Sequence, residues 1–265
     1  MELTSWLMLA AIAGLASYLQ TITGFAFGLI FMSAVAISGV IGIEDGATVV
    51  SILVLVNAAL VLTKDRAYIA KGPFLQIAPI ALATTVIGTL LLPLLLSKSV
   101  IWLKFILGAV IVVSSLQLLW LRKGAGERRP NWAFPLSGLI GGMMGGLFAI
   151  PGPPIVYALQ RYLPVQREIR ATLVAIFAVI TILRLGLSSV LHPPAANILA
   201  TAGMLAPVTI LATTVAHRWP PPLSAEMLKV ITVCLLVLTG ILLLWPALAD
   251  TVQFGLVSRA EAAVT

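Results

Sequence analysis

The sequence is a series of apolar stretches, most of them close to the length that crosses a lipid bilayer, separated by short polar loops. A transmembrane α-helix needs about 20 apolar residues. The stretches cover residues 6–43, 47–63, 73–96, 100–121, 132–159, 171–191, 198–216 and 223–248. The stretches at 6–43 and 132–159 are interrupted, the second by both glycine and proline. The sequence therefore predicts an all-α polytopic membrane protein with eight to ten hydrophobic segments.

Composition indicates that lipid is the solvent for most of this surface. Charged residues make up only 9% of the chain and hydrophobic residues 60%, whereas soluble domains carry about 25% charged residues. So few charges cannot cover a water-facing surface of this size. We therefore expect a multi-pass protein of the cell (cytoplasmic) membrane, surrounded by membrane lipid. The first five residues lack the basic start of a cleaved leader, so the first segment is expected to be retained.

The net charge of +7 does not indicate a nucleic-acid partner. The basic residues lie in short loops between apolar stretches rather than on one face, and cytoplasmic loops of membrane proteins carry such an excess. Cys234 is the only cysteine, so neither an intrachain disulfide nor a cysteine metal cluster can form.

The second half of the chain repeats the pattern of the first. At an offset of 124 residues, Gly14 matches Gly138 and Gly28 matches Gly152. The apolar segments coincide throughout, which favours a duplication. The predicted organisation is a first transmembrane repeat at 1–121, a cytoplasmic linker at 122–131, a second transmembrane repeat at 132–250 and a polar tail at 251–265.

The basic loops predict how the two repeats are oriented, because basic residues in short loops favour the cytoplasm. Four loops carry them, with Lys64, Arg66 and Lys71 in the first, Arg122, Lys123, Arg128 and Arg129 in the second, Arg161, Arg167 and Arg170 in the third, and Arg218 in the fourth. They can share one side only if each interrupted pair leaves the membrane on the side it entered. The repeats would then have inverted topology, which is typical of secondary transporters.

An interrupted segment opens each repeat, and these segments are the candidate binding site. Irregular backbone at membrane depth is tolerated only where protein buries it or an aqueous cavity adjoins it. Proline opens helices, so we expect helices to begin near Pro153 and, by symmetry, near Gly28. Their positive N-termini would face an anion at mid-membrane. The candidate residues here are Gln20, Thr23, Gly24, Phe25, Gly28, Gly145, Gly146, Phe148, Pro151, Gly152 and Pro153. Close helix packing by small residues is the alternative explanation for the glycines.

Three polar residues inside apolar segments complete the candidate site. Arg184 lies in the second half of the segment at 171–191, with no acidic residue within one helical turn. A charge at such depth costs about 3 kcal/mol or more, so a substrate anion is one possible partner. Snorkelling to the outer face and pairing with backbone carbonyls are the alternatives. Asn57 and Thr181 are equivalent positions of the two repeats, suited either to donating to an oxyanion or to bridging helices.

Catalytic and metal-binding motifs are absent from the sequence. It contains no HExxH, GxSxG or nucleotide-binding loop, and none of its nine acidic residues lies in the middle of an apolar segment. We therefore expect neither an enzyme nor a cofactor. With no nucleotide site, transport would run on ion or substrate gradients, with H+ or Na+ as the candidate coupling ions.

The interrupted segments resemble those of the sulfite exporter TauE/SafE family. The second repeat has Gly141-Gly142-Met143-Met144-Gly145-Gly146-Leu147-Phe148-Ala149-Ile150-Pro151-Gly152-Pro153-Pro154, followed by Arg170-Ala171-Thr172. The first repeat has Thr23-Gly24-Phe25-Ala26-Phe27-Gly28, where Ala26 and Phe27 replace a richer glycine run. The resemblance implies movement of sulfite, thiosulfate or organosulfonates across the cytoplasmic membrane.

Taken together, these patterns predict a secondary transporter of a small anion that works by alternating access. An anion channel and a membrane-embedded enzyme or assembly partner stay open as alternatives. The oligomeric state is also open, a homodimer included.

Overall fold

The computed structural model describes residues 3–98, 105–113, 116, 132–219, 233–234, 237 and 241. The elements are α1 (Leu3–Thr23), α2 (Ala26–Ser38), α3 (Ile43–Asp65), the short 3-10 helix η1 (Arg66–Tyr68), α4 (Lys71–Lys98), α6 (Ala133–Phe148), α7 (Gly152–Tyr162), α8 (Gln166–Leu191) and α9 (Ala196–Arg218). The described residues contain no strand. The predicted linker and tail, and most of the predicted segments at 100–121 and 223–248, lie outside them.

Five of these helices are long and apolar enough to cross a membrane. They are α1, α3 with η1, α4, α8 and α9. The helices α2 and α6 are apolar but shorter. The prediction of an all-α, multi-pass membrane protein is therefore confirmed.

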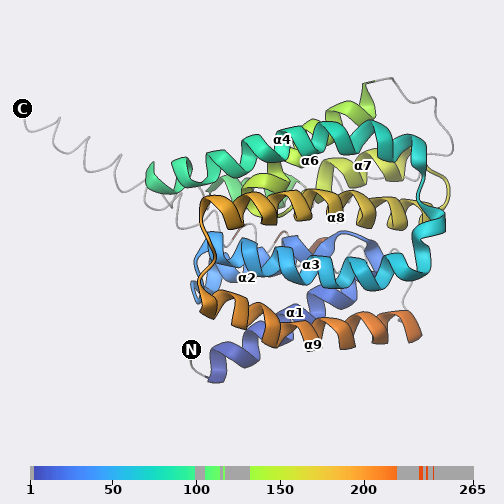
Figure 1. Ribbon diagram of the computed structural model, residues 1–265. Helices are drawn as coiled ribbons and strands as arrows, with labels where there is room; N and C mark the ends of the chain where they lie inside the picture. Colours follow the sequence, from blue (N-terminus) through green and yellow to red (C-terminus); the bar gives the residue numbers. More distant parts are fainter. Residues whose placement is uncertain are drawn as a thin grey trace, which may run out of the picture.

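The two interrupted segments fold as helical hairpins. The chain turns back after α1 into α2, and again after α6 into α7 (Figure 1). The open end of the second hairpin is held by Phe134 at the start of α6 and Tyr162 at the end of α7, whose rings meet edge to face at 5.9 Å. Each hairpin returns to the end of the molecule from which it came, as the distribution of basic loops predicted.

Helices α3 and α8 run antiparallel through the middle of the molecule, between the layer of α4, α6 and α7 and the layer of α1 and α9 (Figure 1). Asp65 at the end of α3 pairs with Arg167 near the start of α8, at 2.8 Å. At the other end of the pair, Arg184 of α8 donates to the carbonyl of Ala47 in α3. The two contacts fix both the direction and the register of the pair.

Each outer helix packs against a helix from the other half of the chain. Helix α4 packs in parallel along α6, because Gly138, Gly142 and Gly146 come against successive turns of α4. A Cβ at Gly142 would lie 2.2 Å from the carbonyl oxygen of Ala81, so only glycine permits this approach. Helix α1 packs along α9, where Tyr18 donates to the carbonyl of Trp219. Close helix packing by small residues, the alternative explanation for the glycines, therefore applies to this face of α6.

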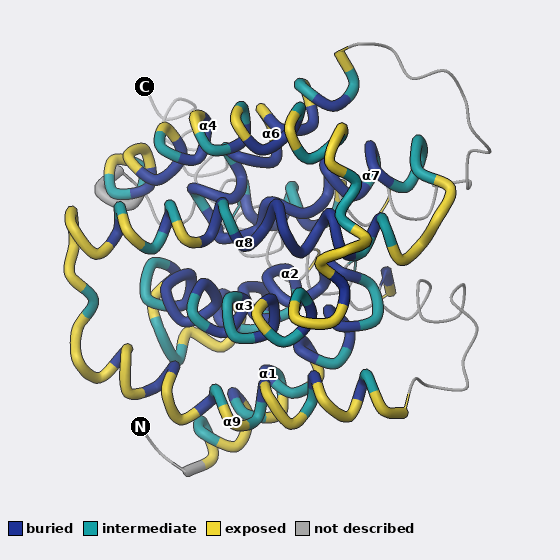
Figure 2. The backbone as a smooth tube through the Cα atoms, turned by 45° about the vertical axis from the view of Figure 1, so that its right-hand side comes forward, coloured by how far each residue is buried: buried dark blue, intermediate teal, exposed yellow. Residues whose placement is uncertain are grey.

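The described basic loops lie at one end of the molecule. The end of α3 and the start of α8 are joined there by the Asp65 ion pairs, and α9 ends on the same side (Figure 1). Buried residues line the interior, whereas exposed residues follow the outer faces of α4 and α9 (Figure 2). Large apolar side chains such as Leu75 and Leu211 are exposed there, as expected for a surface that meets lipid.

Candidate functional site

The first helix break lies between α1 and α2, at Gly24 and Phe25. Gly24 has a φ of +90°, a conformation that glycine adopts without the strain of a side chain. Its N–H donates to the carbonyl of Gln20 at 2.6 Å and closes the last turn of α1. Helix α2 then begins at Ala26, two residues before the position predicted from Gly28.

The second break lies between α6 and α7. Ala149 ends α6 in the left-handed conformation, with a φ of 57°, and its N–H donates to the carbonyl of Gly145 at 3.0 Å. Helix α7 begins at Gly152, one residue before the predicted start. Pro153 follows in the first turn, where a missing N–H costs nothing because that group has no partner within the helix.

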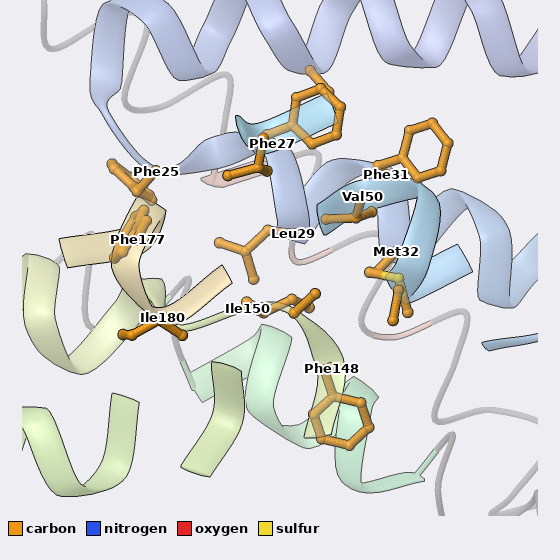
Figure 3. Close-up of a cluster of buried hydrophobic side chains, with 14 of the residues drawn as sticks. Phe25, Phe27, Leu29, Phe31, Met32, Val50, Phe148, Ile150, Phe177 and Ile180 are labelled. Atoms are coloured by element: carbon orange, nitrogen blue, oxygen red, sulfur yellow. The ribbon is translucent and has the colours of Figure 1, made fainter. Parts of the chain in front are cut away.

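The two breaks meet and leave a small cavity between them. A Cβ at Gly28 would lie 2.8 Å from the carbonyl oxygen of Ala149, so the first turn of α2 rests on the second break. The space is narrow, because a water-sized sphere could place its centre within only about 10 Å3 of it, although about 260 Å3 is free of atoms when the adjoining open solvent is included. The lining residues are Gln20, Phe25, Gly28, Val54, Ala149, Ile150, Pro151, Gly152, Phe177 and Thr181. Phe25 and Phe177 lie side by side at one edge of this region, with Ile150 beyond them (Figure 3).

Gln20 connects the cavity to a buried network of side-chain amides and hydroxyls. Its Oε1 accepts from the N–H of Phe27 at 3.1 Å, which caps the N-terminus of α2. Its Nε2 donates to Oδ1 of Asn57 at 3.2 Å. Nδ2 of Asn57 donates to the hydroxyls of Thr21 and Thr213, at 2.9 and 2.8 Å. Asn57 is therefore placed behind Gln20, with its amide donors already engaged.

Thr181 of α8 lines the cavity directly. The residue is 95% buried, yet the described residues provide no hydrogen-bond partner for its hydroxyl. Most other buried hydroxyls on these helices, such as that of Thr85, donate to a carbonyl four residues earlier. The hydroxyls of Thr89 and Thr209 also lack a partner among the described residues, so what distinguishes Thr181 is its position in the cavity lining.

Arg184 is fully buried but does not line the cavity. Its Nε donates to the carbonyl of Gly146 at 3.1 Å. Its Nη1 donates to the carbonyl of Ala47 at 3.2 Å and to the hydroxyl of Ser51 at 3.0 Å. Of the alternatives considered for this residue, pairing with backbone carbonyls is the arrangement observed.

The other predicted site residues support the breaks rather than line the cavity. The hydroxyl of Thr23 donates to the carbonyl of Leu19 within α1. Gly146 packs against α4, and a Cβ at Gly145 would lie 2.8 Å from Ile180 of α8. Phe148 belongs to the hydrophobic core. Gly24 packs on the backbone of Arg170, and Pro153 is buried in the first turn of α7.

Four cavity residues were not predicted from the sequence, namely Val54, Ala149, Ile150 and Phe177. Helical spacing could have found two of them. Phe177 lies four residues before Thr181 and Val54 lies three before Asn57, so each shares a face with a predicted residue. Among the described residues, no group of three or more histidine, cysteine, aspartate or glutamate side chains could hold a metal ion.

Comparison with known proteins places the chain in a family. The family model described as "Sulfite exporter TauE/SafE" matches residues 9–243. A protein of Cupriavidus necator described as "Probable sulfite/organosulfonate exporter TauE" is 30% identical over 241 residues, which cover 91% of this chain and 94% of that protein. No solved structure matches the chain. The family match spans the helix breaks and the cavity between them, and the chain belongs to the sulfite exporter TauE/SafE family of membrane transporters.

Proposed function

We propose that this protein is a secondary transporter that moves a small anion by alternating access, and that the anion binds in the cavity between the two helix breaks. The anion would be a sulfur oxyanion or an organosulfonate. The observation that supports the proposal is the meeting of two helix N-termini and a free threonine hydroxyl at one partly enclosed cavity.

The helix ends favour a negative solute. The first N–H groups of a helix lack partners within it and carry a partial positive charge. In α2, Gln20 uses the N–H of Phe27, so those of Ala26 and Gly28 are the candidates for binding. In α7, the prolines after Gly152 have no N–H, which leaves the Gly152 amide as the single donor of that turn. None of the cavity residues is acidic.

The cavity also has an apolar part that suits an organic group. Phe25, Val54, Ile150 and Phe177 line it alongside the polar groups. Small-molecule sites commonly combine apolar walls with a few placed polar groups. A sulfonate has a charged head and a small carbon tail, so the lining supports the substrate class that the relative's description names for that protein.

The predicted residues would contribute in two ways. Gln20, Phe25, Gly28, Pro151, Gly152 and Thr181 would contact the anion, since all of them line the cavity. Asn57 would orient Gln20. Thr23, Gly24, Gly145, Gly146, Phe148, Pro153 and Arg184 would hold the two breaks in the geometry that the contacting residues need.

The inverted repeat belongs to the same proposal. Under it, α1, α2, α3 and α4 correspond to α6, α7, α8 and α9. The parallel packing of α4 on α6 and of α1 on α9 then becomes one interaction made twice, and the antiparallel pair of α3 and α8 lies on the axis. This packing between the two halves supports repeats at 1–121 and 132–250 that move against each other, as in other inverted-repeat transporters.

A glycine in the cavity provides the test. A Cβ at Gly152 would lie 3.7 Å from both Phe25 and Phe177, which is ordinary contact distance. Gly152→Ala should therefore fold and at the same time narrow the cavity. In proteoliposomes we expect saturable flux of sulfite or a small sulfonate by the wild type, and a much lower flux by Gly152→Ala.

The matched control is Gly203→Ala on α9, because nothing lies within 4 Å of a Cβ there. It should transport like the wild type. Equal flux through all three proteins would contradict the placement of the site. Flux that rises without saturation and ignores H+ and Na+ gradients would indicate a channel instead.

A further inference from the structure

The two helix breaks carry the same hydrogen-bond arrangement, each completed by an arginine of α8. At the first break the N–H of Gly24 donates to the carbonyl of Gln20, and Nη1 of Arg170 donates to the next carbonyl, that of Thr21, at 3.3 Å. At the second break the N–H of Ala149 donates to the carbonyl of Gly145. The next carbonyl accepts again from an arginine, through the 3.1 Å bond between Gly146 and Arg184.

The carbonyls that accept from the two arginines also occupy the same position in their helices. Thr21 is the third residue from the end of α1, and Gly146 is the third from the end of α6. The last carbonyls of a helix have no partner within it and form its negative end. Each arginine therefore binds the negative end of one broken helix, beside the break that lines the cavity.

Helix α8 presents both arginines and the cavity residues on one face. Arg170 and Arg184 are fourteen residues apart, which is close to four helical turns, or about 21 Å along the axis. Phe177 lies midway between them, and Thr181 lies one turn further on. One face of one helix thus meets the first break, the cavity and the second break in succession.

The two arginines differ in their remaining partners. Arg170 also pairs with Asp65, so part of its charge is balanced there. The other groups bound by Arg184 are neutral, namely the carbonyl of Ala47 and the hydroxyl of Ser51. Glu44, in the first turn of α3, acts on Arg184 only through space.

We infer that Arg170 and Arg184 are a matched pair of positioning residues, which cap the broken ends of α1 and α6 and hold both breaks against the transport site without touching the substrate. Arg184 in addition contributes positive charge near the cavity and so favours anions with two charges over anions with one. The electrostatic part rests on the proposed anion site, whereas the capping part does not.

Hydrogen exchange of the purified protein without substrate tests the caps. Arg184→Gln should speed exchange in residues 145–152 and leave 20–28 unchanged, and Arg170→Gln should do the reverse. Two control variants remove a neighbouring bond but keep the cap. Ser51→Ala removes a partner of Arg184, and Arg167→Gln removes the other arginine bound to Asp65. The inference would be overturned if a break whose arginine is replaced exchanged its amide hydrogens at the same rate as in the wild type. It would also be overturned if the control variants accelerated exchange as much as the arginine variants do.

Anion affinity tests the charge of Arg184. At alkaline pH, where sulfite carries two charges and methanesulfonate one, ligand-dependent thermal stabilisation gives the two affinities. We expect Arg184→Gln to weaken sulfite binding by about three- to thirtyfold, methanesulfonate binding by less, and Arg184→Lys to restore most of the difference. Equal weakening of both anions would overturn the electrostatic role. If the wild type binds neither anion, the proposed function fails. The hydrogen-exchange experiment still tests whether the two arginines cap the broken helices, because it uses no substrate.

Discussion

At the scale of single residues, two buried polar side chains of α8 have different surroundings. Thr181 was predicted as a site residue and lines the cavity. Arg184 stood out as a charge with no acidic residue within a helical turn. Its partners come from Gly146, Ala47 and Ser51, which are more than thirty residues away in the chain. Hydrophobic periodicity carries no information about such long-range contacts, so the choice between ligand and carbonyl partner needed the fold.

The free hydroxyl of Thr181 leads to a prediction at this scale. Thr181→Val keeps the shape of the side chain and removes only the hydroxyl, which binds no described group. We expect folding to be preserved and sulfite affinity to fall by about three- to tenfold, the value of one hydrogen bond. Thermal stabilisation by added sulfite measures this.

A second threonine supplies the comparison. The hydroxyl hydrogen of Thr85 is shared between the carbonyl of Ala81 in its own helix, at 2.7 Å, and the carbonyl of Gly142 in α6, at 3.1 Å, so it joins α4 to α6. Thr85→Val should lower the melting temperature without added anion and leave the sulfite-dependent increment intact. The hypothesis for Thr181 is wrong if its valine variant behaves in the same way.

At the scale of elements, both helix breaks were predictable and the packing of the helices was not. Gly24 and Pro153 act on the backbone locally, through positive φ and a missing N–H, so their effects are visible in the sequence. The starts of α2 and α7 fall within two residues of the predicted positions. The packing of α4 on α6 and of α9 on α1 depends on the surfaces of helices that are distant in the chain. The glycine spacing of α6 indicated only that some helix comes close.

The contact of α4 with α6 predicts a stability defect. A Cβ at Gly142 would overlap the carbonyl of Ala81 and the hydroxyl of Thr84. Gly142→Ala must therefore move two helix backbones apart, and we expect a loss of about 1–3 kcal/mol of stability, as for other overpacked cores. Thermal unfolding in detergent measures it against Gly203→Ala, where a Cβ has open space. Equal melting temperatures would contradict the close packing described for this pair.

At the scale of the whole molecule, the distribution of basic residues predicted which loops share an end. The loops after α3 and before α8 are joined through Asp65, and α9 ends beside them (Figure 1). This could be predicted because loop charge is a property of the sequence alone and acts during insertion. The predicted linker at 122–131 lies outside the described residues and stays a prediction.

The shared end predicts the outcome of cysteine labelling. Cys234 is free and exposed, so Cys234→Ser gives a suitable background. In that background, Val165→Cys, at the basic end between α7 and α8, should react with a membrane-impermeant thiol reagent only in inside-out vesicles. Ser38→Cys, at the exposed end of α2, should react only in right-side-out cells. Labelling of both from the same side would contradict the topology.

The prolines that open α7 have a consequence for the passage of the solute. They leave α7 a single N–H in its first turn, at Gly152, whereas the first turn of α2 keeps those of Ala26 and Gly28. Under the proposed function, the two walls of the binding site are therefore unequal. A sulfonate would settle with its head toward one wall and its tail toward the aromatic rings, and it would not tumble while bound. A solute that keeps this orientation during the crossing would leave into the second compartment with the same end leading as it entered from the first.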